Sequence, residues 1–175
     1  TLFVLSDGGV RAAGDNSAGQ LGHAQADRQA TAYRVPALDA VVQAAGGAGH
    51  SLFRRRDGSV WGCGANDCGQ LGASTEQLTR PAPIPGVDDI VAVATGKKHS
   101  LFLRADGYVL ALGDNRHGQL GNGHEPHADS PIMVPGLQGV RAVAAGHYHS
   151  LYLHEDGRVC ASGNNVTGAL GDGTV

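Results

Sequence analysis

The sequence has few of the features that mark membrane proteins and disulfide-rich secreted proteins. Only 17% of its 175 residues are charged and only 5% are aromatic, with one tryptophan and one methionine. Its three cysteines are an odd number at unrelated spacings, which fits neither a disulfide framework nor a CxxC metal site, so we expect an intracellular setting. No apolar run approaches the ~18 residues that a membrane span requires, so we expect no membrane partner.

The chain also lacks an excess of charge of either sign. It has 13 Lys and Arg residues against 16 Asp and Glu residues, and its pI is near 6.3. Such a chain has no overall field that would hold a polyanion, so nucleic acid is not expected as its main ligand. A Rossmann fingerprint, a P-loop and a nucleophile elbow are all missing, so we expect no cofactor and no catalytic residue.

Glycine, by contrast, is abundant, at 28 of 175 residues. Many glycines lie in a block that reads Gly-x-Asn-x-x-Gly-Gln-Leu-Gly, with Ala169 replacing Gln in the last copy. The four copies begin at Gly14, Gly64, Gly113 and Gly163, at spacings of 50, 49 and 50 residues. A second block, His-Ser-Leu-aromatic, begins at His50, His99 and His149, and an Asp-Gly pair follows each copy. A fixed period of this length indicates a repeat architecture.

Each unit is predicted to be β-structure. Short apolar runs such as 90–93, 101–103 and 108–112 are separated by glycine turns, and no helical period is present. The Asp-Gly pairs lie between two such runs, as in a tight two-residue hairpin whose central residues both have positive φ.

The third copy predicts the order of strands within a unit. We expect a strand ending near Gly96, a strand from His99 to Arg104, a hairpin at Asp106-Gly107, a strand to Gly113 and a fourth strand around residues 132–134. Four-stranded antiparallel units that repeat about every 50 residues are typical of the blades of a β-propeller.

These blocks resemble the regulator of chromosome condensation repeat. The repeat reads Val-Pro-Gly-Leu, then Val-x-x-Val-Ala-x-Gly-x-x-His-Ser-Leu, then Asp-Gly, then the glycine block, and here it corresponds to residues 134–137, 140–151, 156–157 and 163–171. The resemblance covers the whole chain and implies a seven-bladed propeller. We therefore expect one incomplete propeller over residues 1–175, with repeats at 1–34 (partial), 35–83, 84–133 and 134–175 (partial), and with another segment or chain supplying the rest.

The residues that recur in the repeats are interpreted as structural, because a residue needed once for chemistry would not appear in every blade. They are His50, His99, His149, Asn16, Asn66, Asn115 and Asn165. We expect the asparagines to adopt left-handed turns and bond locally, and the histidines to satisfy buried backbone groups. Ser51 and Ser100 follow their histidines directly, so they point to the opposite face and cannot bond to them. Gln20, Gln70 and Gln119 are expected to form hydrogen bonds between blades.

Function is sought where the copies differ. In a meander the Gly-x-x-His turns and the Gly-x-Asn loops share one face, and the Asp-Gly hairpins occupy the other. The residues that differ on the first face at neighbouring blades are Lys97, Lys98, Arg116, His117, His147 and Tyr148. We expect them to gather positive charge around one aromatic ring, either as a solvated basic rim or as a docking patch for an acidic protein surface.

Two further features stand out. Arg54 replaces the leucine of Leu103 and Leu153, so we expect it to point toward a blade interface and to pair with a carboxylate of a neighbouring blade or of a partner. Residues 124–129 contain four side chains that can bind metals, but they lie in a loop with a proline and lack the i, i+4 helical geometry of known zinc pairs. An ordinary solvated loop is favoured there over a metal site.

The leading hypothesis is a non-enzymatic protein-interaction scaffold within a larger protein or assembly. The resemblance implies an alternative, because the founding member of the family catalyses guanine-nucleotide exchange on the small GTPase Ran while docking on nucleosomes. Such exchange needs a wedge that projects from the propeller. The nearly constant repeat spacing leaves no room for an inserted wedge within these 175 residues, and none of them matches an exchange residue on its motif.

Overall fold

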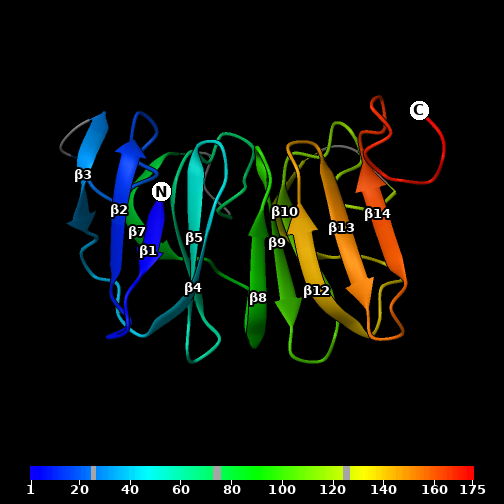
Figure 1. The fold of residues 1–175 in the computed structure, drawn as a ribbon, viewed down its shortest axis with the longest axis horizontal. Helices are drawn as coiled ribbons and strands as arrows, with labels where there is room; N and C mark the ends of the chain where they lie inside the picture. Colours follow the sequence, from blue (N-terminus) through cyan, green and yellow to red (C-terminus); the bar gives the residue numbers. More distant parts are fainter. Residues whose placement is uncertain (25–26, 73–75, 124–126) are drawn as a thin grey trace.

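The computed structural model describes residues 1–24, 27–72, 76–123 and 127–175, which form four antiparallel sheets arranged side by side (Figure 1). The first blade contains β1 (Leu2–Val4), β2 (Val10–Asp15) and β3 (Arg28–Arg34). The second contains β4 (Val41–Gly46), β5 (His50–Arg55), β6 (Val60–Gly64) and β7 (Leu78–Pro83). The third contains β8 (Ile90–Thr95), β9 (His99–Arg104), β10 (Val109–Gly113) and β11 (Ala128–Met133), and the fourth contains β12 (Val140–Ala145), β13 (His149–His154) and β14 (Val159–Gly163).

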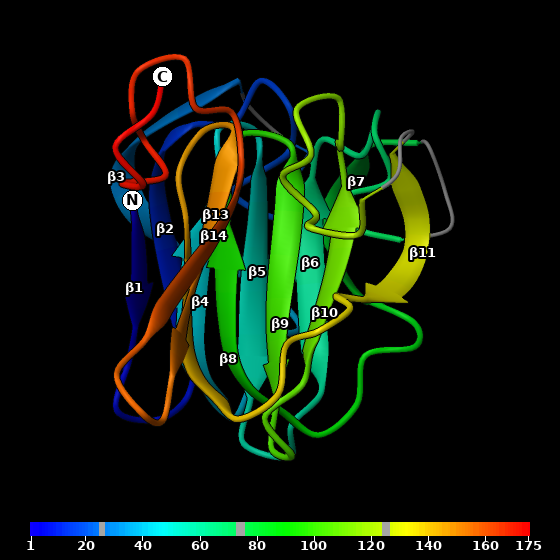
Figure 2. The same cartoon turned by 90° about the vertical axis from the view of Figure 1, so that its right-hand side faces the viewer.

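Each blade is a meander in which consecutive strands pair. Figure 2 shows the third blade with β8, β9, β10 and β11 in sequence order across the sheet. The innermost strands β4, β8 and β12 contact one another in series, so the blades are packed face to face around one side of the molecule. The prediction of an all-β fold with four-stranded antiparallel blades is confirmed. No helix in the described part of the chain is long and apolar enough to span a membrane.

The apolar core lies between the blades, and each middle strand serves two interfaces. In β9, Phe102 packs with Leu52 of the second blade, whereas its neighbours Leu101 and Leu103 pack with Tyr152 of the fourth. This follows from the period of two in a strand, which sends successive side chains to opposite faces of the sheet. Burial on both faces explains why β9 is apolar at consecutive positions.

The Asp-Gly hairpins differ from the expected two-residue turn. In the first blade, Gly8 N donates to Leu5 O at 2.9 Å and Leu5 N donates to Gly9 O at 2.9 Å, which makes a three-residue loop. Only the glycine has positive φ, 79° at Gly8, and the expectation for Asp7 was wrong. The aspartate carboxylate instead accepts a hydrogen bond from Gly9 N at 2.8 Å, so the pair combines a side-chain cap with a left-handed glycine.

The connection between the first two blades contains two alanines in left-handed conformations. Ala37 has φ 61° and Ala40 has φ 51°, where the connection before the fourth blade has Gly136 and Gly139. An L-residue with a Cβ atom is disfavoured in this region, so this connection stores strain that the glycine-containing one avoids.

Candidate partner-binding face

One face of the molecule is built from the Gly-x-x-His turns and the Gly-x-Asn loops, which dock on each other within each blade. Asp114 N donates to Lys98 O at 2.8 Å, and Asn164 N donates to Tyr148 O at 2.9 Å. We call this surface the turn-and-loop face; it lies where β2 and β14 end (Figure 1). The hairpins lie at the other end, where Gly107 O accepts from Val140 N of the next blade at 3.1 Å.

The loop asparagines hold their own loops closed. Asn66 Oδ1 accepts from Leu71 N at 2.7 Å, and its Nδ2 donates to Gly72 O at 3.0 Å. Asn16, Asn115 and Asn165 accept the equivalent backbone bond at 2.8, 2.9 and 2.9 Å. The expectation that these asparagines take left-handed conformations was wrong, because the glycines of the same loops, such as Gly69 with φ 76°, do so instead.

The histidines link each blade to the next. His50 Nε2 lies 3.1 Å from Ser100 Oγ of the following blade, and that hydroxyl donates to Gln70 O at 2.7 Å. His99 makes the same contact with Ser150 at 3.0 Å, and Ser150 donates to Gln119 O at 2.7 Å. We call this arrangement the inter-blade staple. A histidine therefore does not bond to the serine beside it but to the serine one repeat later.

The staple also determines the protonation of its histidines. Because each serine hydroxyl already donates to a carbonyl, the imidazole must donate from Nε2. Burial lowers the pKa of His50 to about 3 and the pKa of His99 to about 4. Both rings are therefore neutral at pH 7 and act as buried hydrogen-bond donors.

The glutamine side chains stay within their own loops. Gln70 Oε1 accepts from Cys68 N at 2.9 Å, and its Nε2 donates to Asp67 Oδ1 at 3.2 Å. The expectation that these side chains cross between blades was wrong, since the backbone carbonyl of Gln70 makes that contact instead. A carbonyl is present whatever the residue, which explains how Ala169 can stand in the fourth copy.

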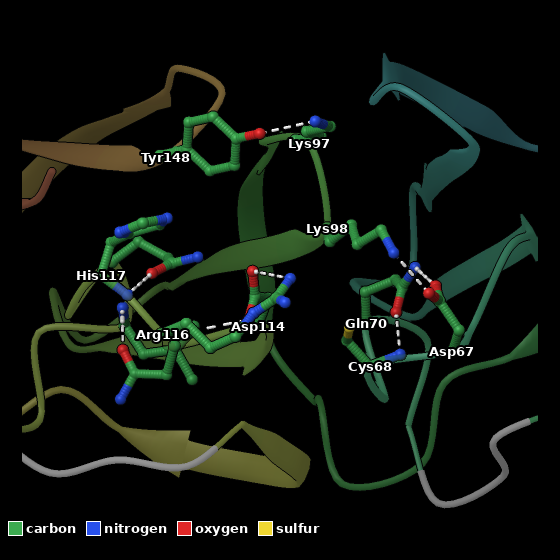
Figure 3. A network of polar contacts seen from close by, with 12 residues as sticks. Asp67, Cys68, Gln70, Lys97, Lys98, Asp114, Arg116, His117 and Tyr148 are labelled. Atoms are coloured by element: carbon green, nitrogen blue, oxygen red, sulfur yellow. Dashed lines mark hydrogen bonds and ion pairs between the residues drawn. The ribbon is translucent and has the colours of Figure 1, made fainter.

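The structure brings the cationic and aromatic residues of this face together, and Figure 3 labels Lys97, Lys98, Arg116, His117 and Tyr148; His147 contacts the Tyr148 ring. Lys97 Nζ donates to the Tyr148 hydroxyl at 2.5 Å and lies 4.9 Å from the centroid of its ring. The Tyr148 ring meets His117 and His147 edge to face, with centroids 5.0 and 6.0 Å apart. Side chains from the third and fourth blades thus form one aromatic and cationic cluster on the turn-and-loop face.

Two aspartates alter the charge of this cluster. Lys98 forms an ion pair with Asp67, and Arg116 forms a two-bond pair with Asp114 at 2.8 and 3.2 Å (Figure 3). The hydrogen bond from Lys98 holds the pKa of Asp67 below its usual value. The net positive charge of the cluster is therefore smaller than expected, because these carboxylates neutralise two of the cations.

The sequence carried a signal for these aspartates. Asp114 is the variable residue of its Gly-x-Asn block, and Asp67 follows the asparagine of the preceding block. Each aspartate is next to a loop asparagine in the sequence, so each lies on the same face as the cations. A search for residues of either charge sign at the variable loop positions would have found them.

Arg54 lies away from the cluster, at the interface between the second and third blades. Its Nε donates to Gln43 Oε1 at 3.4 Å, and the Gln43 amide bonds to both the N and the O of Val93, each at 3.1 Å. Within the described residues its partner is therefore an amide, and the expected carboxylate of a neighbouring blade was wrong. Gln43 relays the contact from Arg54 to the next blade.

The region around 124–129 is described only in part, since residues 124–126 lie outside the described residues. Of its metal-capable side chains, those of His127 and Asp129 are described and exposed. Across the described chain, no group of three or more His, Cys, Asp or Glu side chains is placed to hold a metal ion. All three cysteines are free, and burial raises the pKa of Cys63 to about 12.

Comparison with known proteins finds matches along most of the chain. A family model described as "Regulator of chromosome condensation (RCC1) repeat" matches residues 57–103 and 106–153, and a second model of the same description matches 41–70, 90–119 and 140–169. "Protein RCC2" of Mus musculus is 35% identical over 85 residues, which are 47% of this chain and 16% of that protein.

Two solved structures from yeast share the fold. Yeast RCC1 (Prp20), in its crystal structure bound to Kap60, superposes with a TM-score of 0.88 at 25% identity, over 99% of this chain and 44% of that chain. Prp20p from Saccharomyces cerevisiae, described with its binding properties to Gsp1p and histones, superposes with a TM-score of 0.79 at 29% identity, over 93% and 41%. This chain thus spans less than half of either structure.

Proposed function

Because the chain belongs to the regulator of chromosome condensation (RCC1) repeat family, we propose that it is a protein-docking module that holds its partner on the turn-and-loop face. The observation that carries this proposal is the cluster around Tyr148, where side chains that differ between the repeats converge from two blades. Tyrosine and arginine are enriched among the residues that dominate protein interfaces. No catalytic residue and no cofactor form part of the proposal.

The partners named for the similar yeast proteins support the proposal of a protein-docking module. The yeast proteins are described with Kap60, Gsp1p and histones, all of them proteins. The recurring and the variable residues of this chain have different roles. His50, Ser100 and Asn66, which recur in the repeats, make contacts inside the propeller. The variable side chains of the face are left to recognise a partner. Free cysteines fit the intracellular setting expected for such a module.

Charge reversal on the two ends of the blades tests the proposal. One protein carries Lys97→Glu and Lys98→Glu on the turn-and-loop face, and its matched control carries Arg104→Glu and Arg158→Glu at the hairpins, where each arginine also lies beside an aspartate. Affinity capture followed by mass spectrometry should lose partners only in the first protein. Loss in the hairpin protein alone would contradict the proposal.

Guanine-nucleotide exchange on a small GTPase, with docking on chromatin, is the second candidate. The observation in its favour is the superposition on Prp20p, described with Gsp1p and histones. It differs from simple docking in a measurable way, because an exchange factor releases its GTPase when free nucleotide is added. A captured GTPase that dissociates on addition of GTP, and whose bound GDP exchanges faster with the protein present, would favour this candidate over a scaffold.

A further inference from the structure

The three permanent cations of the cluster are not equivalent. Lys98 is held by Asp67 and Arg116 by Asp114, so each has a carboxylate as its immediate partner. Lys97, among the residues that the structure describes, pairs with a neutral tyrosine hydroxyl instead. The net positive charge of the cluster is therefore concentrated on one ammonium group.

That ammonium is held in place before any partner arrives. Lys97 Nζ donates to the Tyr148 hydroxyl and lies at the hydroxyl end of the ring, 4.9 Å from its centroid, while His117 and His147 make T-shaped contacts with the same ring. The Lys97 backbone is fixed as well, because its N–H donates to His147 O at 3.1 Å. A lysine ammonium has three N–H donors, so Tyr148 leaves two for a ligand. A fixed side chain loses little conformational entropy on binding.

A hollow on the turn-and-loop face is lined by Gly96 and His147, the chain neighbours of Lys97 and Tyr148, although Lys97 itself does not line it. Its volume is about 280 Å³, and it is lined by the small residues and one imidazole of three successive turns: Gly46, Gly47, Ala48, Thr95, Gly96, Ala145, Gly146 and His147. Lys97 follows directly on Gly96. The small lining residues leave room for a side chain of a partner, and His147 adds a polar imidazole to the lining.

We propose that the Lys97 ammonium binds the carboxylate of an acidic side chain of a protein partner that docks over this hollow. The inference rests on the proposed docking function and specifies what that face recognises. Tyr148 is a positioning residue, because it orients Lys97 through its hydroxyl and ring. Lys98 and Arg116 should contribute less, since Asp67 and Asp114 already offset their charges and would repel an incoming carboxylate.

The same charges disfavour a nucleic acid at this site. A phosphate backbone gains affinity by neutralising several phosphates at once, and the cluster has one cation without a carboxylate partner. Asp67 and Asp114 flank the turn and would repel successive phosphates. A single carboxylate on a protein segment makes one contact with Lys97 and avoids both aspartates.

Binding of a defined acidic probe tests the proposal. The probe is a blocked, fluorescein-labelled peptide of alternating Glu and Gly residues, with a Gln-for-Glu peptide and a single-stranded oligonucleotide as comparison ligands. The Glu peptide should bind and the other two should not. Lys97→Met should weaken its binding by about tenfold or more, whereas Lys98→Met on the same turn should weaken it by less than about threefold. Tyr148→Phe, which keeps the ring, should fall between them.

The outcomes separate this inference from the docking function itself. Equal losses in Lys97→Met and Lys98→Met, tighter binding of the oligonucleotide, or no binding of the Glu peptide would each overturn the acidic-anchor proposal. The docking function fails independently, if partner capture survives charge reversal on the turn-and-loop face. Unfolding curves of all three variants must match the parent protein, so that a loss of binding reports the site.

Discussion

The blade interfaces and the turn-and-loop face are built from neighbouring residues but follow opposite rules. At the interfaces the same contact recurs, His50 to Ser100 and then His99 to Ser150, and every polar atom involved is buried. On the face the equivalent turn positions differ, with Ala48 and Gly49 in one blade and Lys97 and Lys98 in the next. Repetition therefore marks the residues that hold the propeller together, and departures from it mark the surface available for recognition.

Acid should break the interfaces before it affects the face. An unfolded histidine has a pKa near 6.5, so below that pH the unfolded chain takes up protons that buried His50 and His99, with pKa values of about 3 and 4, do not. The free energy of unfolding should therefore fall as the pH drops from 6.5, by about 2 kcal/mol per histidine at pH 5 and about 4 kcal/mol for the two. Urea denaturation at pH 7 and pH 5 measures this loss.

A double variant supplies the control for this pH dependence. In His50→Gln with His99→Gln, an amide N–H can replace the imidazole Nε2–H donor, and no titrating ring remains. Its free energy of unfolding should change much less between pH 7 and pH 5. An unchanged pH slope in the double variant would show that other groups cause the acid sensitivity.

Removing one serine should open a single staple. Ser100→Ala leaves the His50 Nε2–H and the Gln70 carbonyl without their shared partner in a buried interface. Each unsatisfied buried group costs about 1–3 kcal/mol, so we expect a loss of about 3 kcal/mol in the free energy of unfolding. The matched control is Ser130→Ala on the exposed edge of β11, which should change it by less than about 0.5 kcal/mol. Similar losses in both variants would contradict the staple.

Relief of strain should stabilise the connection between the first two blades. Ala37→Gly places glycine where the connection before the fourth blade already has Gly136, and it removes a Cβ atom from a left-handed conformation. We expect a gain of about 1 kcal/mol in the free energy of unfolding, measured by thermal or urea denaturation. Ala30→Gly in the exposed strand β3 should instead lower it by a similar amount. A loss in Ala37→Gly would disprove the strain.

The face should tolerate substitution with the smallest effect on folding. The Lys98–Asp67 pair is partly solvent-exposed, with side-chain exposures of 35% and 55%, so water and salt screen it. Lys98→Met should therefore change the free energy of unfolding by less than about 0.5 kcal/mol in urea denaturation. A loss as large as that of Ser100→Ala would mean that the face is part of the structural framework.

The sequence was sufficient to predict the fold, because the repeated blocks depend on preferences that act between residues close in the sequence. Alternating apolar residues, left-handed glycines and the Asp-Gly pairs act within a few residues, and they correctly predicted the four-stranded blades and the family resemblance. The turn type was missed because Asp7 acts through its side chain rather than its backbone conformation. That distinction leaves no trace in residue spacing.

The site was harder to predict, because its contacts cross between blades. His50 meets Ser100 from 50 residues away, and Lys98 meets Asp67 from 31 residues away. A repeat places the same residue types in every copy, so it does not say which copy supplies the partner. The positions of the cations followed from topology. The neutralisation of Lys98 depended on Asp67 facing it from the preceding blade, whereas that of Arg116 came from Asp114 two residues away in the same loop.

In the proposed function, partners bind the surface where the repeats differ. Site-specific photo-crosslinking tests it most directly, with a benzoylphenylalanine placed at the position of Thr167 on the turn-and-loop face or at that of Ala105 in a hairpin, both of them exposed. We expect partners to be crosslinked from position 167 and not from position 105. Crosslinking from position 105 alone would contradict it and move the binding surface to the opposite end of the blades.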